Sequence, residues 1–96
     1  MPDFRITAKA MDDLRSIGRY TQDHWGREQR NKYLSMLDAC FHTIVYQPRI
    51  GVTCDNIRSG YRKYHVGRHL IFYRQINNHI EIIRILHDNM DMESHL

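Results

Sequence analysis

The chain has 96 residues, of which 42% are hydrophobic and 26% charged, and its formal net charge is +3. This length supports a single domain with a modest core, which we place at residues 1–96. The sequence contains no run of about 18 apolar residues, and its N-terminus lacks the basic and then apolar blocks of a secretion signal. We therefore expect a cytoplasmic protein without a membrane span. The basic balance favours an acidic partner, either nucleic acid or protein.

Metal-ligating residue types are present but scattered. The seven histidines form no cluster with thiol or acidic neighbours at ligand spacing, so we expect no metal and no other cofactor. Cys40 and Cys54 are far apart, and small intracellular proteins rarely carry disulfides. Cys40 falls within a helical apolar pattern, which predicts a buried free thiol.

The first half of the chain predicts one strand and a helical hairpin. Residues 3–7 alternate in polarity and indicate a short strand. Thr7 is a suitable N-cap for a helix whose apolar residues recur at helical spacing as far as Gly26. A second helix is predicted from about Arg27 to Tyr46, because Pro48 prevents its continuation. The two helices must fold back on each other, and Trp25 is predicted to be a core or hinge anchor at their junction.

From Ile57 onward the apolar period becomes strand-like. Three strands are predicted, at residues 62–66, 69–76 and 79–86. Gly67-Arg68 and Asn77-Asn78 would form the turns, and asparagine suits the positive φ of a type I′ hairpin. The fold class is therefore α+β in the order β-α-α-β-β-β, with a helical hairpin packed on an antiparallel sheet.

A two-residue turn at Asn77-Asn78 fixes a register for the last hairpin. Arg74 then faces Glu81, which is a favourable pairing of opposite charges across strands. The same register places Phe72 opposite Ile83 and Leu70 opposite Ile85. One face would carry Leu70, Phe72, Ile83 and Ile85, and the other Ile71, Tyr73, Ile80, Ile82, Arg84 and Leu86.

Both faces of this sheet are largely apolar, although two helices can cover only one of them. A contiguous exposed apolar patch usually marks a partner site, and this is the interpretation we favour. The alternative is that the C-terminal tail, or the loop from Gln47 to Asn56, folds over the second face.

Four segments resemble ParE toxins of the RelE/ParE superfamily, in the same order and spacing: YTQDHWG at residues 20–26, DNIRSGYR at 55–62, VGRHLIFYR at 66–74 and RILHDNMD at 84–91. The resemblance implies a RelE/ParE-like fold and a toxin of a type II toxin–antitoxin system. It further implies inhibition of DNA gyrase by binding rather than catalysis. The implied partner is a ParD-like antitoxin, and we expect no sequence-specific DNA binding by this chain itself.

RelE-like toxins, the sibling branch, instead cleave messenger RNA on the ribosome, and their catalytic pattern is poorly matched. When the final Tyr-Arg of the RelE strand motif is placed on Tyr73-Arg74, Leu70 occupies the position of the catalytic arginine. Lys63 is also the single lysine where a pair is expected. A ribonuclease nevertheless stays open, because nearby residues could substitute, namely His65, His87, Arg68 and Arg84. An inactive homologue that only binds the antitoxin is the third alternative.

We expect no catalytic residues and predict contact residues for the antitoxin or the target. Arginines can hold an acidic segment through charge-assisted hydrogen bonds, and tyrosines are enriched at interfaces. In ParE-like proteins the C-terminal end is tied to toxicity. The predicted contact residues are Arg58, Arg62, Tyr64, Arg68, Tyr73, Arg84, His87, Met92 and Leu96. Two alternatives remain: Arg84 could form a salt bridge with Asp88 or Asp91, and His87 could be a structural hydrogen-bonding residue.

Overall fold

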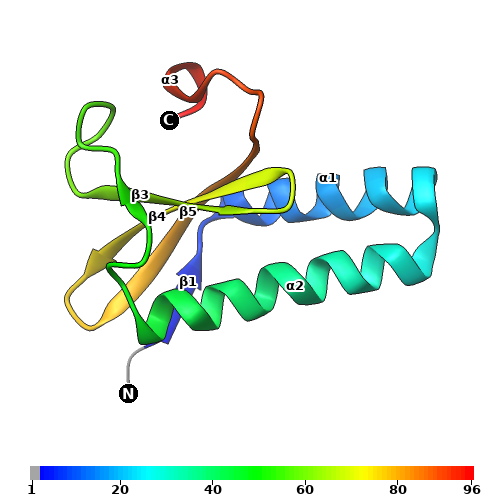
Figure 1. The fold of residues 1–96 in the computed structure, drawn as a ribbon, viewed down its shortest axis with the longest axis horizontal. Coiled ribbons are helices and arrows are strands. Elements are labelled where there is room, and N and C mark those ends of the chain that lie inside the picture. Colours follow the sequence, from blue (N-terminus) through cyan, green and yellow to red (C-terminus); the bar gives the residue numbers. More distant parts are fainter. Residues whose placement is uncertain (1–2) are drawn as a thin grey trace.

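The computed structural model describes residues 3–96 as a helical hairpin packed on a sheet (Figure 1). Met1 and Pro2 lie outside this range. They are the first two residues of the N-terminal stretch in which a secretion signal was sought. The elements are β1 (Asp3–Ile6), α1 (Ala8–Trp25), α2 (Arg27–Tyr46), β2 (Val52–Thr53), β3 (Tyr61–Val66), β4 (His69–Ile76), β5 (His79–His87) and α3 (Met92–His95). The predicted α+β class and the order of the principal elements are confirmed.

The helical hairpin forms where the sequence predicts it. The Thr7 hydroxyl accepts a hydrogen bond from the Ala10 amide at 3.1 Å and donates one to the Ile83 carbonyl at 2.9 Å, so it caps α1 and ties it to β5. Gly26, with φ of 92°, separates the two helices in a conformation that side chains disfavour. The joined ends of α1 and α2 project beyond the sheet (Figure 1). Trp25 lies at this tip and is 64% exposed, so of the two predicted roles, core or hinge anchor, the core is wrong.

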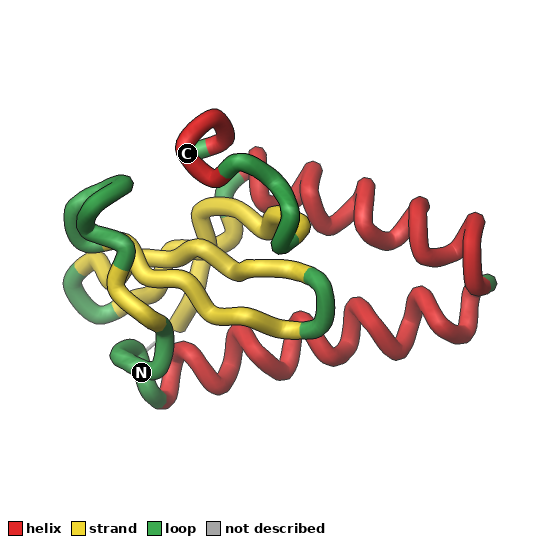
Figure 2. The backbone as a smooth tube through the Cα atoms, turned by 45° about the horizontal axis from the view of Figure 1, so that its top comes forward, coloured by secondary structure: helices red, strands yellow, loops and turns green. Residues whose placement is uncertain are grey.

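The five strands lie in the order β1-β5-β4-β3-β2. The sheet is mixed rather than purely antiparallel, because β1 runs parallel to β5. The short edge strand β2 was missed, since two residues carry no detectable alternation. Strands form one layer and the two long helices another (Figure 2). The principal core lies between these layers and includes Leu37, Phe41, Ile71, Tyr73, Ile82 and Ile85.

A β-bulge divides the β4–β5 hairpin. The predicted pairs Ile76–His79 and Arg74–Glu81 are confirmed, and Arg74 donates from Nε to Glu81 at 2.9 Å. Beyond them the prediction is wrong, because Tyr73 pairs with Ile82 and Phe72 with Arg84. Ile83 is therefore an extra residue in β5, and every later side chain changes face. Leu70 faces Leu86, not Ile85, and Ile85 belongs to the helix-facing core.

The face of the sheet opposite the helices is covered by the chain itself. Phe72 and Leu86 are almost completely buried there together with Cys54 from the loop that follows β2. Residues of the loop, the strands and the tail surround them: Ile57, Tyr61, Leu70, Ile83, Met92 and Leu96. The expectation of an open apolar patch is therefore wrong, and the alternative of a covering loop and tail is confirmed.

Candidate functional site

The predicted contact residues do not gather on one surface. They fall into three groups, at the tail, at the turn between β3 and β4, and beside the loop that follows α2. Tyr64 belongs to none of these groups, because it packs against the helix-facing core. The three groups therefore have to be assessed separately.

The tail group joins α3 to the sheet. Met92 and Leu96 pack on the apolar cluster around Phe72 and Leu86 on the face opposite the helices. They are four residues apart and lie on one side of the helical turn. Arg58 donates from Nη2 to the main-chain oxygen of Leu96 at 2.6 Å, and Arg84 donates from Nη1 to that of His95 at 3.0 Å. These contacts make the tail a cover that is held by two apolar side chains and two arginines.

Arg84 is engaged chiefly by a residue that sequence reasoning missed. Its Nε and Nη2 donate to the two carboxylate oxygens of Asp13 on α1 at 2.8 and 2.9 Å. The Ile85 amide donates to the same carboxylate at 3.0 Å. The hydrogen bonds from the Arg84 guanidinium to Asp13 raise the arginine's pKa above its usual value. The predicted partners Asp88 and Asp91 are wrong, and Arg84 ties α1 to the bulged part of β5.

The second group surrounds the β3–β4 turn. His65 Nε2 and His87 Nδ1 each lie 3.3 Å from a carboxylate oxygen of Asp88, and the Asp88 amide donates to the Arg68 carbonyl at 2.9 Å. Asp88 therefore links β3, the β3–β4 turn and the end of β5. Among residues 3–96, no set of His, Cys, Asp and Glu side chains is placed to hold a metal ion.

His69 lies beside this group and is linked to α2. The Tyr33 hydroxyl accepts a hydrogen bond from the Arg68 amide at 3.2 Å, and the same oxygen is hydrogen-bonded to His69 Nδ1 at 2.6 Å. Burial lowers the pKa of His69, and the neighbouring His87 lowers it further. Both effects favour the neutral form of His69.

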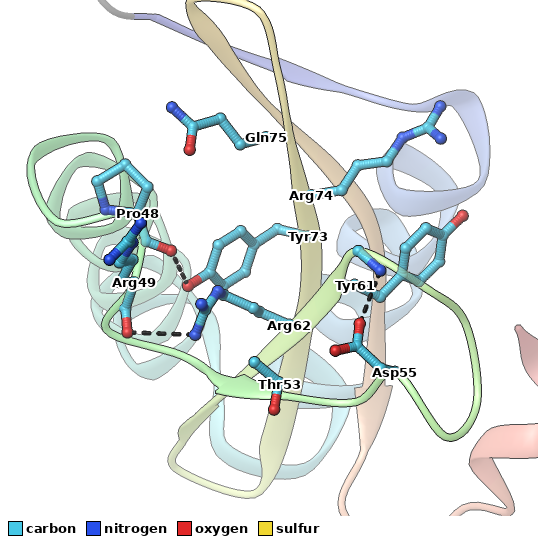
Figure 3. A pocket seen from close by; sticks show the side chains of 10 residues that line it. Pro48, Arg49, Thr53, Asp55, Tyr61, Arg62, Tyr73, Arg74 and Gln75 are labelled. Atoms are coloured by element: carbon cyan, nitrogen blue, oxygen red, sulfur yellow. Dashed lines mark hydrogen bonds between the residues drawn. The ribbon is translucent and has the colours of Figure 1, made fainter.

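The third group lines a cavity of about 250 Å³ beside the start of β3 (Figure 3). Tyr73 is 1% exposed, donates its hydroxyl to the Pro48 carbonyl at 2.8 Å and accepts from the Gly51 amide at 2.8 Å. Burial raises the pKa of this phenol. Arg62 donates to the Gly51 carbonyl at 2.7 Å. Tyr73 therefore fixes the loop after α2, and the Arg62 guanidinium lies beside the same loop.

Comparison with known proteins identifies the family. The family model described as ParE toxin of type II toxin-antitoxin system, parDE, matches residues 4–92. The chain belongs to the ParE toxin family. This ParE-family chain is 38% identical to Toxin ParE1 of Caulobacter vibrioides, over 100% of this chain and 99% of that protein. It is 37% identical to Toxin ParE1 of Mycobacterium tuberculosis, over 97% of this chain and 96% of that protein.

A solved structure supports the fold of the ParE-family chain. The structure, described as the chromosomal ParDE TA system from P. aeruginosa, matches with a TM-score of 0.77 and 20% identity, covering 91% of this chain and 96% of that chain. The family match covers both long helices and, apart from Asp3, all five strands. No helix within residues 3–96 is long and apolar enough to cross a membrane.

The sequence analysis of this ParE-family chain missed two cavity residues and did not predict the exposed aromatic residues at the hairpin tip. Arg49 and Asp55 line the cavity beside Arg62, but a charged residue in a loop gives no local signal of that. Tyr20 and Trp25 form an exposed aromatic cluster with His24 at the tip of the hairpin, with ring centroids 3.9–5.9 Å apart. Their helical spacing resembles that of core residues, so exposure could be found only from the structure.

Proposed function

We propose that this chain is a cytoplasmic toxin that inhibits DNA gyrase by binding and is neutralised by a ParD-like antitoxin. The observation that carries the proposal is the full-length relationship to two proteins named Toxin ParE1. Inhibition by binding needs a stable surface and no reacting group, and gyrase is the target that the ParE resemblance implies. The solved relative is described as a ParDE system, which supports an antitoxin as the partner.

The geometry of the sheet face opposite the helices favours binding over RNA cleavage. Cleavage requires cationic side chains and a proton donor or acceptor around an accessible phosphate. Leu70, at the position of the catalytic arginine in RelE-like toxins, packs under the tail with Phe72. Arg84, the cation of this face in β5, is neutralised by Asp13. An RNA strand would have to displace the tail and would then meet mainly apolar side chains.

A ribonuclease remains the second candidate because of the histidines at the end of the sheet. His65 and His87 flank Asp88, and Arg68 is exposed on the adjoining turn. This group contains an acid–base pair and a cation, which are the elements that phosphodiester cleavage needs. It lies outside the covered apolar cluster and is reachable from solvent.

The two functions separate in one set of assays on the purified chain. We expect it to reduce supercoiling by gyrase, to leave ribosome-bound messenger RNA intact, and to lose its effect when the antitoxin is added. Cleavage of the RNA that disappears in His87→Ala but persists in His42→Ala, an exposed histidine on α2, would establish the ribonuclease instead. If the chain affects neither target and its expression is harmless, the inactive homologue is the correct description.

A further inference from the structure

The cavity beside the start of β3 carries positive charge that the fold does not neutralise. Arg49, Arg62 and Arg74 all line it. Arg74 pairs with Glu81 at 2.9 Å, with its guanidinium 5.9 Å from the centre of the Tyr61 ring. Within residues 3–96, no carboxylate lies at ion-pair distance from Arg49 or Arg62. Two guanidinium groups are thus left without an anionic partner in one cavity.

The hydrogen bonds around Arg62 orient it without neutralising it. Its Nη1 donates to the carbonyl of Gly51 at 2.7 Å and contacts that of Arg49 at 3.5 Å. Carbonyl groups accept these bonds but bring no net charge, so the guanidinium keeps donors for a ligand. The one carboxylate that lines the cavity, Asp55, accepts from the Gly60 amide at 2.8 Å. Figure 3 shows Arg62 beside Arg49, with Asp55 on the other side of the cavity.

The surroundings suit an extended polypeptide. A second, more open hollow is lined by Gln47 and Ile50 and shares Pro48, Arg49 and Gln75 with the cavity, so the two form one groove. The groove adjoins β2, which pairs on one side only and therefore has main-chain groups free on the other. Val52 of this strand is 66% exposed. Edge strands of this kind accept an added strand from a partner.

We propose that this groove binds an extended acidic segment of the antitoxin, with one carboxylate held between Arg49 and Arg62 and main-chain pairing to β2. The inference rests on the proposed antitoxin partnership but not on gyrase as the target. Paired donors of two arginines match the two oxygens of a carboxylate. Pro48 and Tyr61 provide apolar contact for the methylene groups of a glutamate.

A polypeptide fits this groove better than a nucleic acid. Nucleic-acid binding needs a basic track that follows successive phosphates. Here Asp55 lines the same cavity and Glu81 pairs with Arg74, so the uncompensated positive charge is confined to Arg49 and Arg62. A nucleic acid also has no amide groups that could pair with β2. One carboxylate on an extended chain satisfies both the charge and the free strand edge.

The test uses the complete chain and two blocked peptides, one of alternating valine and glutamate and the other with glutamine in place of glutamate. Binding is followed by amide NMR shifts in wild type, Arg49→Gln, Arg62→Gln and Arg19→Gln. Arg19 is an exposed arginine on α1, so its variant loses the same charge far from the groove. We expect shifts at Gly51 and Thr53, about tenfold weaker binding in Arg62→Gln and about threefold weaker binding in Arg49→Gln.

Equal affinity for the two peptides, equal losses in all three variants, or shifts confined to other surfaces would overturn the proposal. So would a single-stranded oligonucleotide that shifts the same amides when the acidic peptide does not. Arg49 makes no side-chain ion pair within residues 3–96, so its variant remains informative if Arg62→Gln fails to fold.

Binding of the antitoxin, measured with wild type and with a doubly substituted chain, separates the groove proposal from the proposed antitoxin partnership. Undiminished antitoxin binding by a chain carrying both Arg49→Gln and Arg62→Gln refutes the groove and leaves the partnership standing. If the wild-type chain does not bind the antitoxin, both the groove and the partnership are refuted.

Discussion

Replacing Asp13 by alanine should destabilise the fold far more than the same change at its neighbour Asp12. The Asp13–Arg84 pair is largely buried, with side chains 15% and 17% exposed, and the Asp13 carboxylate also accepts from the Ile85 amide. Losing one partner of a buried pair costs about 3–5 kcal/mol, and an amide without its acceptor costs about 1–3 kcal/mol. The remaining exposure of the two side chains reduces both costs, so we expect Asp13→Ala to lower the free energy of unfolding by about 3 kcal/mol.

Asp12→Ala is a closely matched control. Asp12 lies on the same helix and holds Arg15 at 2.9 Å, but the two side chains are 73% and 67% exposed. An exposed pair contributes about 0–1 kcal/mol, and both variants make the same change in helix propensity. The measurement is urea unfolding followed by circular dichroism. Asp13→Asn, which keeps an acceptor for Ile85, should fall between wild type and Asp13→Ala. The reasoning is refuted if Asp13→Ala and Asp12→Ala differ by less than about 1 kcal/mol.

Two further predictions concern the turn between β3 and β4. Gly67→Ala should lower the melting temperature more than Gly60→Ala. Both glycines have positive φ, but a Cβ at Gly67 would lie 2.7 Å from the Tyr33 hydroxyl oxygen, whereas a Cβ at Gly60 would meet no atom within 4 Å. Equal losses of melting temperature would mean that the clash at Gly67 is relieved. The free energy of unfolding should fall as the pH drops below about 6.5, because burial and His87 depress the pKa of His69 in the folded state and protons then favour the unfolded chain. His69→Gln should flatten that dependence in urea titrations at several pH values, and an unchanged slope would assign it to other groups.

The helical half of the fold could be predicted because its signals are local. Thr7 caps α1, Gly26 separates the helices and Pro48 follows the second helix, and each acts on its immediate neighbours. The Arg74–Glu81 pair could be predicted for the same reason, since a two-residue turn fixes the register near it. These features depend on at most a few residues on either side.

The bulge at Ile83 could not be predicted, because apolar residues occupy both faces of β5 around it. With the bulge, Ile85 replaces Leu86 in the helix-facing core, which is one apolar residue for another, and Arg84 moves to the opposite face. The Asp13–Arg84 pair is equally hidden, since its members are 71 residues apart. Met92 and Leu96 stand in a polar tail, and two apolar residues do not reveal the surface that they cover.

Because the sheet face opposite the helices is covered, charge rather than apolar surface is expected to select a partner. An open apolar sheet would attract partners through buried area, an effect that salt weakens little. Here the tail already covers Phe72 and Leu86, and Arg58, Arg74 and Arg84 are engaged within the fold. The groove instead offers the uncompensated positive charges of Arg49 and Arg62 beside the free edge of β2. Association at that groove would therefore depend on ionic strength and on acidic residues in the partner, whereas association at the apolar face would first require the tail to leave.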